Sequence, residues 1–244
     1  MFRQLIRLPL KLIPRNIAIP ILTGPSRGLK WVSGSGTHGC WLGTYERDRQ
    51  QRLLEVLKPG QCFLDIGANV GFYSLLASRI VGAAGQVHSF EPFPRNVDYL
   101  KRHVEMNRLP NVTVYPVALS DGPDRTMSFA TSINPSSGHL SATVSTPNQI
   151  EVDVTSLDAL WKRNAFPKPA VIKIDVEGAE FSVLNGGRHM LHACRPIILL
   201  AGHGTAVQEQ CCDLLRSWGY RIQIDRDGKI DGMYETTAWP SYLN

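Results

Sequence analysis

The chain has 244 residues, of which 43% are hydrophobic, and a formal net charge of +5 at pH 7. This length suits one sizeable α/β domain and is short for two. Residues 1–45 hold six Lys or Arg and no Asp or Glu, so the rest of the chain is electrically balanced. A nucleic-acid-binding protein would need a basic stripe on its folded body, and we therefore expect no nucleic-acid partner.

The five cysteines are an odd count and form no Cys-x-x-Cys pair. This pattern argues against a zinc site and against a disulfide framework. Buried free thiols in a reducing compartment are the simpler interpretation. We accordingly expect a cytoplasmic protein, either free or at the periphery of a membrane.

Residues 1–15 place basic side chains between Leu and Ile, and Pro9 and Pro14 interrupt any continuous helix. The segment is too short and too charged to span a bilayer. Three interpretations remain: an arm packed on its own domain, a basic anchor in contact with anionic lipid, or an organelle transit peptide. We divide the chain into a basic N-terminal arm and loop at 1–45 and a folded domain at 46–244.

Strand and helix signals alternate from residue 46 onward. Apolar periodicity predicts helices at 46–57, 71–81, 95–107, 156–163, 179–193 and 206–217, and strands at 62–66, 86–90, 112–117, 170–175, 196–201, 220–225 and 230–237. Such alternation requires right-handed crossovers and a parallel sheet. We expect a single Rossmann-like, doubly wound α/β domain, whose mostly parallel seven-stranded sheet ends in an antiparallel C-terminal edge hairpin.

Residues 118–155 break this alternation. Short alternating segments at 126–130 and 150–154 flank a loop at 134–141 that is rich in Ser, Gly and Pro. An insertion of this composition is usually a surface hairpin and sometimes a substrate lid. Both interpretations stay open from the sequence.

The strand at 62–66 runs into a turn with the pattern Asp65-x-Gly67-x-Asn69-x-Gly71. Gly and Asn tolerate positive φ, so this turn lets the backbone approach a ligand closely. A dinucleotide-binding fingerprint would need glycine at positions 69 and 72, where the chain has Asn and Phe. The pattern instead resembles the first motif of class I S-adenosylmethionine (SAM) methyltransferases.

Ligands of doubly wound sheets lie outside the carboxyl ends of the strands. Glu91 follows Gly71 by 20 residues, at the end of the second strand, where a carboxylate can accept hydrogen bonds from ribose hydroxyls. Asp65 either orients the glycine turn or reaches the amino group of the cofactor. The other residues expected at this edge are Ala118, Asp175 and His203.

A second stretch of interest contains Asp175, Glu177 and Glu180. Three carboxylates within six residues repel one another unless a cation, a substrate hydroxyl network or a helix N-terminus compensates. Glu180 is explained as an acid in the first turn of a helix. Asp175 precedes that turn, so this explanation does not apply to it.

Four segments, in this order and spacing, resemble FkbM-type methyltransferases: D-I-G-A-N-V-G-F-Y-S at 65–74, F-E-P at 90–92, V-A-L-S-D at 117–121 and K-I-D-V-E-G-A-E at 173–180. The resemblance spans roughly residues 43–204. It implies a SAM-dependent methyltransferase domain at 46–244 and, most often, O-methylation of a sugar hydroxyl in a glycan, a glycolipid or a glycosylated small molecule. The SAM-binding residues it implies are Asp65, Gly67, Asn69, Gly71, Glu91, Pro92, Ala118 and Asp175. One departure is Ala201, where such proteins commonly carry Glu.

The reaction we expect is an in-line attack of a substrate hydroxyl on the SAM methyl group, with Asp175, Glu177 or His203 as the base. A Mg²⁺ ion held by carboxylates and water is the alternative to a base, and we rank it second and assign no metal ligand. Two rival functions are a SAM-binding partner or regulatory protein without turnover and, third, a nucleotide-dependent oxidoreductase.

Overall fold

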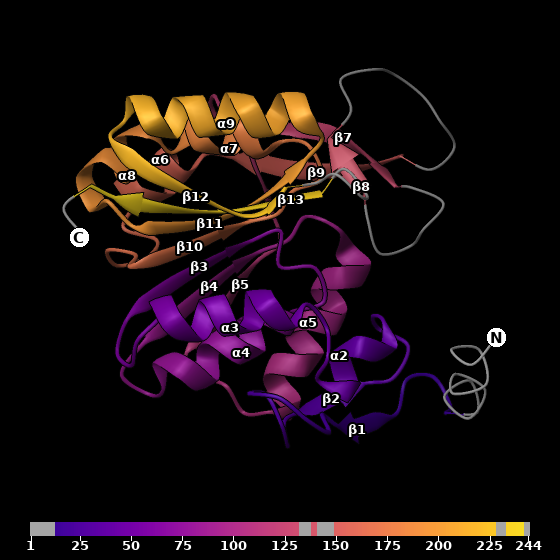
Figure 1. The fold of residues 1–244 in the computed structure, drawn as a ribbon. Helices are drawn as coiled ribbons and strands as arrows, with labels where there is room; N and C mark the ends of the chain where they lie inside the picture. The colour runs from indigo at the N-terminus through magenta and orange to yellow at the C-terminus, as the bar shows by residue number, and fades with distance from the viewer. Residues whose placement is uncertain (1–12, 132–137, 141–148, 228–232, 242–244) are drawn as a thin grey trace.

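The computed structural model describes residues 13–131, 138–140, 149–227 and 233–241, and its central element is a seven-stranded sheet (Figure 1). The strand order is β12-β13-β11-β10-β3-β4-β5. The strands are β3 (Cys62–Ile66), β4 (Gln86–Phe90), β5 (Val112–Tyr115), β10 (Val171–Ile174), β11 (Ile197–His203), β12 (Tyr220–Asp227) and β13 (Met233–Pro240).

The five strands from β11 to β5 are parallel to one another, and β13 is antiparallel to both of its neighbours, β11 and β12. The expected fold class is therefore confirmed. The C-terminal hairpin is present, and its second strand, β13, lies between β11 and β12, so that β12 forms the edge of the sheet.

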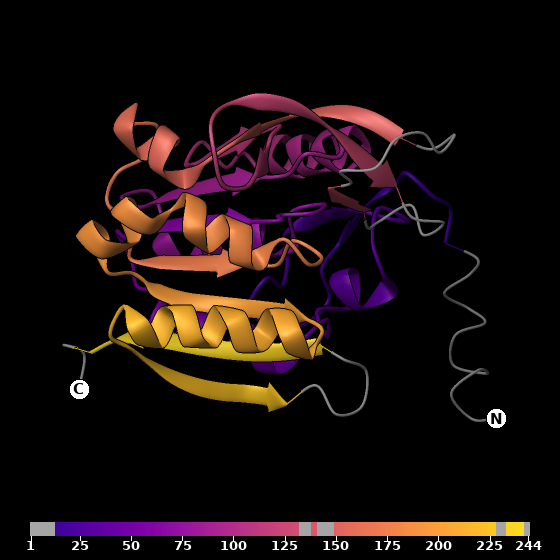
Figure 2. The ribbon, with the colours of Figure 1, turned by 90° about the horizontal axis from the view of Figure 1, so that it is seen from above.

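Helices cover both faces of the sheet (Figures 1 and 2). One layer holds α3 (Arg47–Val56), α4 (Phe72–Val81) and α5 (Pro94–Met106), and the other holds α6 (Leu157–Lys162), α7 (Glu180–Gly186), α8 (Arg188–Cys194) and α9 (Thr205–Ser217). A strand between two such layers must be apolar on both sides. All five residues of β3 are accordingly buried, with Phe63 in the core under α4 and Leu64 in the core under α7.

The helix predicted at 179–193 is two helices in the structure, α7 and α8. The break falls at Gly186 and Gly187, where the chain passes close to other segments. A Cβ atom at Gly186 would lie 2.1 Å from the Ser120 carbonyl oxygen, and one at Gly187 would lie 2.8 Å from Leu157 Cδ1. Glycine permits this close approach, which periodicity alone did not reveal.

The described part of the N-terminal arm packs on α5. Strands β1 (Ala18–Pro20) and β2 (Lys30–Val32) form an antiparallel pair, and the short helix α2 (His38–Leu42) follows. Trp31 is fully buried and stacks on His103 with ring centroids 4.1 Å apart, while the Val32 amide donates to His103 Nε2 at 2.9 Å. Residues 1–12, to which most of the anchor hypothesis refers, lie outside the described residues. Within the described ranges, no helix has the length and apolar character needed to cross a membrane.

The insertion forms a separate four-stranded sheet in the order β6-β9-β7-β8. Its strands are β6 (Ala118–Leu119), β7 (Arg125–Thr131), β8 (Gly138–Leu140) and β9 (Gln149–Thr155), and the two predicted alternating segments are the antiparallel pair of β7 and β9. Most of the loop at 134–141, for which a lid was considered, lies outside the described residues.

Candidate active site

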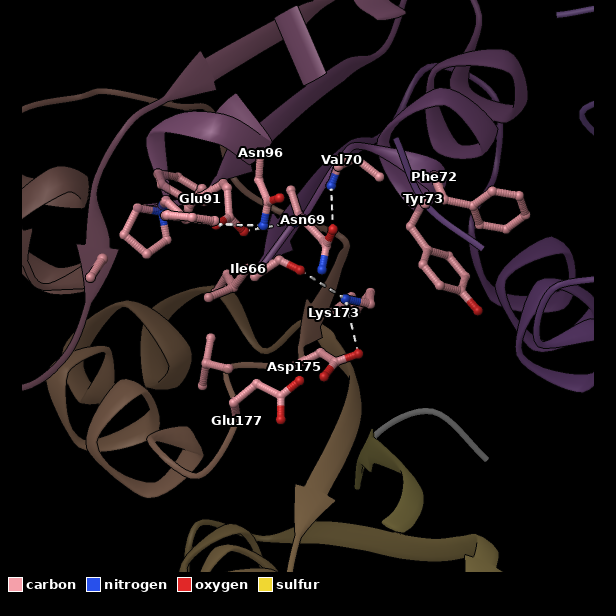
Figure 3. Close-up of a pocket in the computed structure, with 18 of the residues that line it drawn as sticks. Ile66, Asn69, Val70, Phe72, Tyr73, Glu91, Asn96, Lys173, Asp175 and Glu177 are labelled. Carbon is pink, nitrogen blue, oxygen red and sulfur yellow. Dashed lines mark hydrogen bonds and ion pairs between the residues drawn. The ribbon is translucent and has the colours of Figure 1, made fainter. Parts of the chain in front are cut away.

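A cavity of about 310 Å³ lies at the carboxyl ends of β3, β4 and β10 (Figure 3). Eight of the residues singled out in the sequence line it: Gly67, Asn69, Glu91, Pro92, Ala118, Asp175, Glu177 and His203. Asp65 and Gly71 do not line it. The fold thus brings together residues that are up to 136 positions apart in the chain.

The glycine turn adopts the conformation that its composition indicates. The φ angles are 73° at Gly67, 52° at Asn69 and 92° at Gly71. A Cβ atom at Gly67 would lie 1.8 Å from the Asp175 carbonyl oxygen, and one at Gly71 would lie 2.3 Å from Leu100 Cδ1. Both glycines are therefore needed for close packing of the turn as well as for its φ angles.

Asp65 lies beneath the turn and is completely buried. Its Oδ2 accepts a hydrogen bond from Ser74 Oγ at 2.6 Å, and its Oδ1 lies 3.6 Å from Lys173 Nζ. Lys173 Nζ also donates to the Gly67 carbonyl oxygen at 3.4 Å, which links Asp65 to the turn. The side chain of Asp65 does not line the cavity, and both roles considered for it stay predictions.

Glu91 is buried, and both of its carboxylate oxygens accept hydrogen bonds. Oε2 accepts from the Asn69 amide at 2.8 Å and Oε1 accepts from the Phe93 amide at 3.0 Å. Burial raises the pKa of Glu91 to about 7, although these two amides act in the opposite direction. The carboxylate is thereby fixed at the cavity wall, and small changes in its surroundings decide its charge near neutral pH.

Asp175 is surrounded by cations. Its Oδ2 lies 3.1 Å from Arg49 Nη1 and 3.4 Å from Lys173 Nζ, and its Oδ1 lies 3.7 Å from His203 Nε2. Burial alone would raise the pKa of Asp175, but Lys173, Arg49 and His203 outweigh it and hold this pKa well below its usual range. Asp175 is therefore an ionised carboxylate with little affinity for a proton.

His203, at the end of β11, faces three carboxylates. Its Nδ1 lies 2.7 Å from Oε1 of the fully buried Glu180, and its Nε2 lies 3.4 Å from Glu177 Oε2. Burial lowers the pKa of His203, but the hydrogen bond to Glu180 and the charges of Asp175, Glu180 and Glu177 outweigh burial and raise the pKa above 6.5. Glu180 is thus more than an acid in a first helical turn, because it binds the imidazole directly.

Sequence reasoning missed Arg49, a nine-tenths buried side chain on α3. Besides Asp175, it contacts Glu46 Oε2 at 3.4 Å and Glu235 Oε1 at 3.8 Å. Glu46 also accepts a hydrogen bond from Tyr73 Oη at 2.7 Å. A signal for Arg49 was present, since it lies four and seven residues before Leu53 and Val56 and so shares the apolar face of the helix.

Ala201 stands where similar proteins commonly carry Glu, and the neighbouring strand β13 supplies a glutamate beside it. Ala201 pairs with Glu235 across β11 and β13, so the two side chains project from the same face of the sheet. Glu235 brings a carboxylate to Arg49 from that position. A carboxylate next to Arg49 is therefore present, although residue 201 does not supply it.

No group of three or more His, Cys, Asp or Glu side chains in the described part of the chain has an arrangement that could hold a metal ion. The carboxylate of Asp175 is engaged with Arg49 and Lys173 instead. The Mg²⁺ alternative remains an untested prediction.

Comparison with known proteins identifies relatives of this chain. A curated relative, the hexuronic acid methyltransferase AglP of Haloferax volcanii, is 30% identical over 157 residues, which are 63% of this chain and 61% of that protein. The match thus spans less than two thirds of the relative.

Two solved structures share the fold. The methyltransferase FkbM of Methylobacillus flagellatus KT has a TM-score of 0.56 at 16% identity, over 84% of this chain and 56% of that chain. The precorrin-6y C5,15-methyltransferase of Geobacter metallireducens GS-15 has a TM-score of 0.51 at 16% identity, over 81% and 90% of the two chains. At such identities, the likeness shows the fold alone.

The family model described as "Methyltransferase FkbM domain" matches residues 65–222, a range that holds the glycine turn, Glu91, the carboxylate block and His203. Together with the curated relative, this match supports a methyltransferase domain. The chain belongs to the FkbM family of methyltransferases.

Proposed function

We propose that this protein is a SAM-dependent O-methyltransferase that methylates a hydroxyl group of a sugar or glycoconjugate by in-line displacement. The observation that carries the proposal is the pair of His203 and Glu180, with Nδ1 and Oε1 2.7 Å apart, beside the cavity formed by the glycine turn and Glu91. The relative AglP is named a hexuronic acid methyltransferase, which supports a sugar as the acceptor.

The residues of the cavity fit SAM in both charge and polarity. Ile66, Phe90 and Leu119 offer apolar surface for a purine, and Glu91 offers carboxylate oxygens to ribose hydroxyls. Asp175 and Glu177 make the cavity wall acidic, which suits a cofactor that carries a sulfonium and an ammonium group. Gly67, Asn69, Pro92 and Ala118 complete the wall that would hold it. When bound, SAM supplies a methyl group on a positively charged sulfur, and that methyl group is strongly electrophilic.

His203 is a better candidate base than Asp175, and it is the base of this proposal. The lowered pKa of Asp175 leaves it a poor proton acceptor, whereas the carboxylates around His203 raise its pKa and make it the stronger base. In the tautomer with hydrogen on Nδ1, His203 donates to Glu180 and has a free lone pair on Nε2. The lone pair on Nε2 would take the proton of the substrate hydroxyl, whose oxygen would accept the methyl group as the bond from that group to sulfur breaks and the electron pair stays on sulfur.

Glu180 acts through His203 and is a positioning residue. Its carboxylate fixes the tautomer and the orientation of the imidazole, and it stabilises the imidazolium formed when the proton arrives. Asp175 and Glu177 add negative charge on the side of Nε2, at 3.7 and 3.4 Å. A base of this kind contributes about a hundred- to ten-thousand-fold in rate. Correct positioning of the reacting groups contributes the larger part, about 7–11 kcal/mol of the barrier.

The charges of the site favour a hydroxyl over a carboxylate as the methyl acceptor. A hexuronic acid offers both groups, and a carboxylate would become a methyl ester without help from a base. Asp175, Glu177 and Glu180 would repel an anionic acceptor at His203. A neutral hydroxyl meets no such repulsion and makes use of the base.

A cytoplasmic location is part of this proposal. All five cysteines are free and buried, including Cys62 and Cys194, which is the pattern of a protein that keeps its thiols reduced.

Transfer of isotope-labelled methyl from SAM to a glycan or glycolipid extract tests the proposal. We expect a label that survives mild alkali, since an ether is stable to alkali and an ester is hydrolysed.

Activity that persists after exhaustive EDTA treatment would eliminate the Mg²⁺ alternative. SAM binding without transfer to any acceptor would favour the rival function, a partner protein without turnover. Binding of NAD(P)H in place of SAM would favour the oxidoreductase.

A further inference from the structure

The hairpin of β1 and β2 forms the outer side of the molecule next to α5 (Figure 1). Residues 13–45 contain the cations Arg15, Arg27 and Lys30 and no Asp or Glu. All three cations are exposed, and none lies in the walls of the cavity at the active site. The hairpin is thus basic, and its cations have no role in the proposed reaction.

Two further arginines join these cations through contacts with the hairpin backbone. Arg79 Nη1 donates to the Arg27 carbonyl oxygen at 2.7 Å, and Arg102 Nη2 donates to the Asn16 carbonyl oxygen at 2.8 Å. We call the set Arg15, Arg27, Lys30, Arg79 and Arg102 the basic hairpin face. The acidic residues of α5, Asp98 and Glu105, are exposed and reduce its charge only in part.

The same hairpin carries exposed apolar side chains. Within the described ranges, three large hydrophobic side chains are exposed, and two of them, Ile17 at 42% and Leu22 at 47%, belong to this hairpin. The third, Ile224 at 49%, lies on the edge strand β12. A surface that combines cations with protruding aliphatic groups fits a lipid interface, where the cations meet headgroups and the aliphatic groups enter the acyl boundary.

We propose that the basic hairpin face docks this protein on an anionic membrane surface. Charge complementarity is the main argument, since Arg15, Arg27 and Lys30 lie in a stretch without acidic residues. The chain after residue 45, which supplies Arg79 and Arg102, is balanced overall, with 20 basic and 21 acidic residues. A nucleic acid would use the same cations but would leave Ile17 and Leu22 without a role. The hairpin also leads from Val32 to Gly36 and Thr37, which line the cavity, so docking brings the cavity close to the lipid.

The test is flotation of the full-length protein with vesicles of phosphatidylcholine, alone or mixed with an equal amount of phosphatidylserine. We expect flotation only with the anionic vesicles, and a decrease as salt is added because the charges are screened. The triple variant Arg15→Glu, Arg27→Glu, Lys30→Glu should bind at least about tenfold more weakly, since each basic residue at such a surface contributes to attraction. The variant Ile17→Ser, Leu22→Ser should lose the binding that remains at high salt.

The matched control is Lys162→Glu, Lys168→Glu, Arg216→Glu, which changes the net charge by the same amount at exposed positions, two of them on α6 and α9 across the sheet. It should bind anionic vesicles as the wild type does, and all variants should retain the wild-type melting temperature. Equal losses in both triple variants would overturn the proposal, because net charge alone would then explain binding. So would the absence of flotation, or a hairpin variant that keeps vesicle binding and loses binding to a generic RNA or DNA duplex.

Discussion

The two ends of the cavity are built in different ways. The end at β3 and β4 is shaped mainly by backbone, namely the turn from Gly67 to Gly71 and the amides of Asn69 and Phe93 that hold the Glu91 carboxylate. The end at β10 and β11 consists of charged side chains, with Asp175 and His203 at its centre and Arg49 behind them. The first end derives its shape from local conformation, and the second derives its shape from ion pairs between distant segments.

This difference separates two kinds of function. A backbone cradle recognises a ligand that is the same in every member of a family, since it depends on few side chains. An ion-pair network sets proton affinities. Here it lowers the pKa of Asp175 and raises the pKa of His203. We therefore expect side-chain substitutions at the first end to act mainly on SAM binding, and glycine substitutions there to reduce stability as well. Substitutions at the second end should act mainly on stability and turnover.

The largest effect is expected from Asp175→Asn. The change leaves Arg49 and Lys173 without their shared carboxylate. Removal of one partner from a buried ion pair costs about 3–5 kcal/mol of unfolding free energy, which is the upper limit for the partly buried Asp175. Because the pKa of Asp175 is lowered when folded, the wild type should lose this stabilisation as pH falls below about 3.8, the ordinary value, and the variant should not. Chemical denaturation at a series of pH values measures the unfolding free energy of the wild type and of the variant. In the control Asp213→Asn, the exposed pair with Arg216 is removed instead, and stability should hardly change.

The second prediction compares two glycines with nearly equal φ angles, 73° at Gly67 and 78° at Gly60. A Cβ atom at Gly60 meets nothing within 4 Å, whereas one at Gly67 would meet the Asp175 carbonyl oxygen. Gly60→Ala should therefore cost only the strain of positive φ, about 1–2 kcal/mol. Gly67→Ala should cost about 2–5 kcal/mol, since it adds an overpacking penalty, and should weaken SAM binding. Equal costs would show that close approach at the turn is unimportant.

The sequence predicts the first end of the cavity better than the second end. The glycine turn and the strands could be predicted because their signals are local: positive φ, alternation and apolar runs. The ion pairs of Arg49 with Asp175 and Glu235 could not, because an ion pair depends on which distant residues the fold brings together, although the place of Arg49 on the apolar helix face was visible. Glu180 was interpreted as a helix-start acid, since its position in the first turn explains it equally well until His203 is placed beside it.

Glu180→Gln tests the pairing at the second end. Loss of the carboxylate beside Nδ1 should lower the pKa of His203, because the imidazolium loses its main partner. The acidic limb of the pH profile of kcat/KM should move to lower pH, and the maximum rate should fall by about ten- to hundredfold, since a weaker base remains. An unshifted limb, with the fall in rate alone, would mean that Glu180 has only a structural role. Glu180→Asp should restore part of the shift.

The smallest effect concerns Glu91 at the first end. Since its pKa is raised to about 7 and ribose hydroxyls would favour the ionised form, SAM affinity should increase with pH through that range. The expected change is about tenfold between pH 6 and pH 8. Glu91→Gln should bind SAM more weakly and lose the pH dependence. Calorimetric titration with SAM over pH measures this, and a wild-type affinity independent of pH would contradict the role given to Glu91.

The central claim is that His203 takes the proton of a sugar hydroxyl as that hydroxyl accepts a methyl group. The most direct measurement is methyl transfer from labelled SAM to a glycoconjugate extract by the wild type and by His203→Asn, together with SAM affinity. We predict an alkali-stable label with the wild type, and about a hundred- to ten-thousand-fold slower transfer by the variant at unchanged affinity. Transfer by His203→Asn at the wild-type rate, or a label that alkali removes, would contradict it.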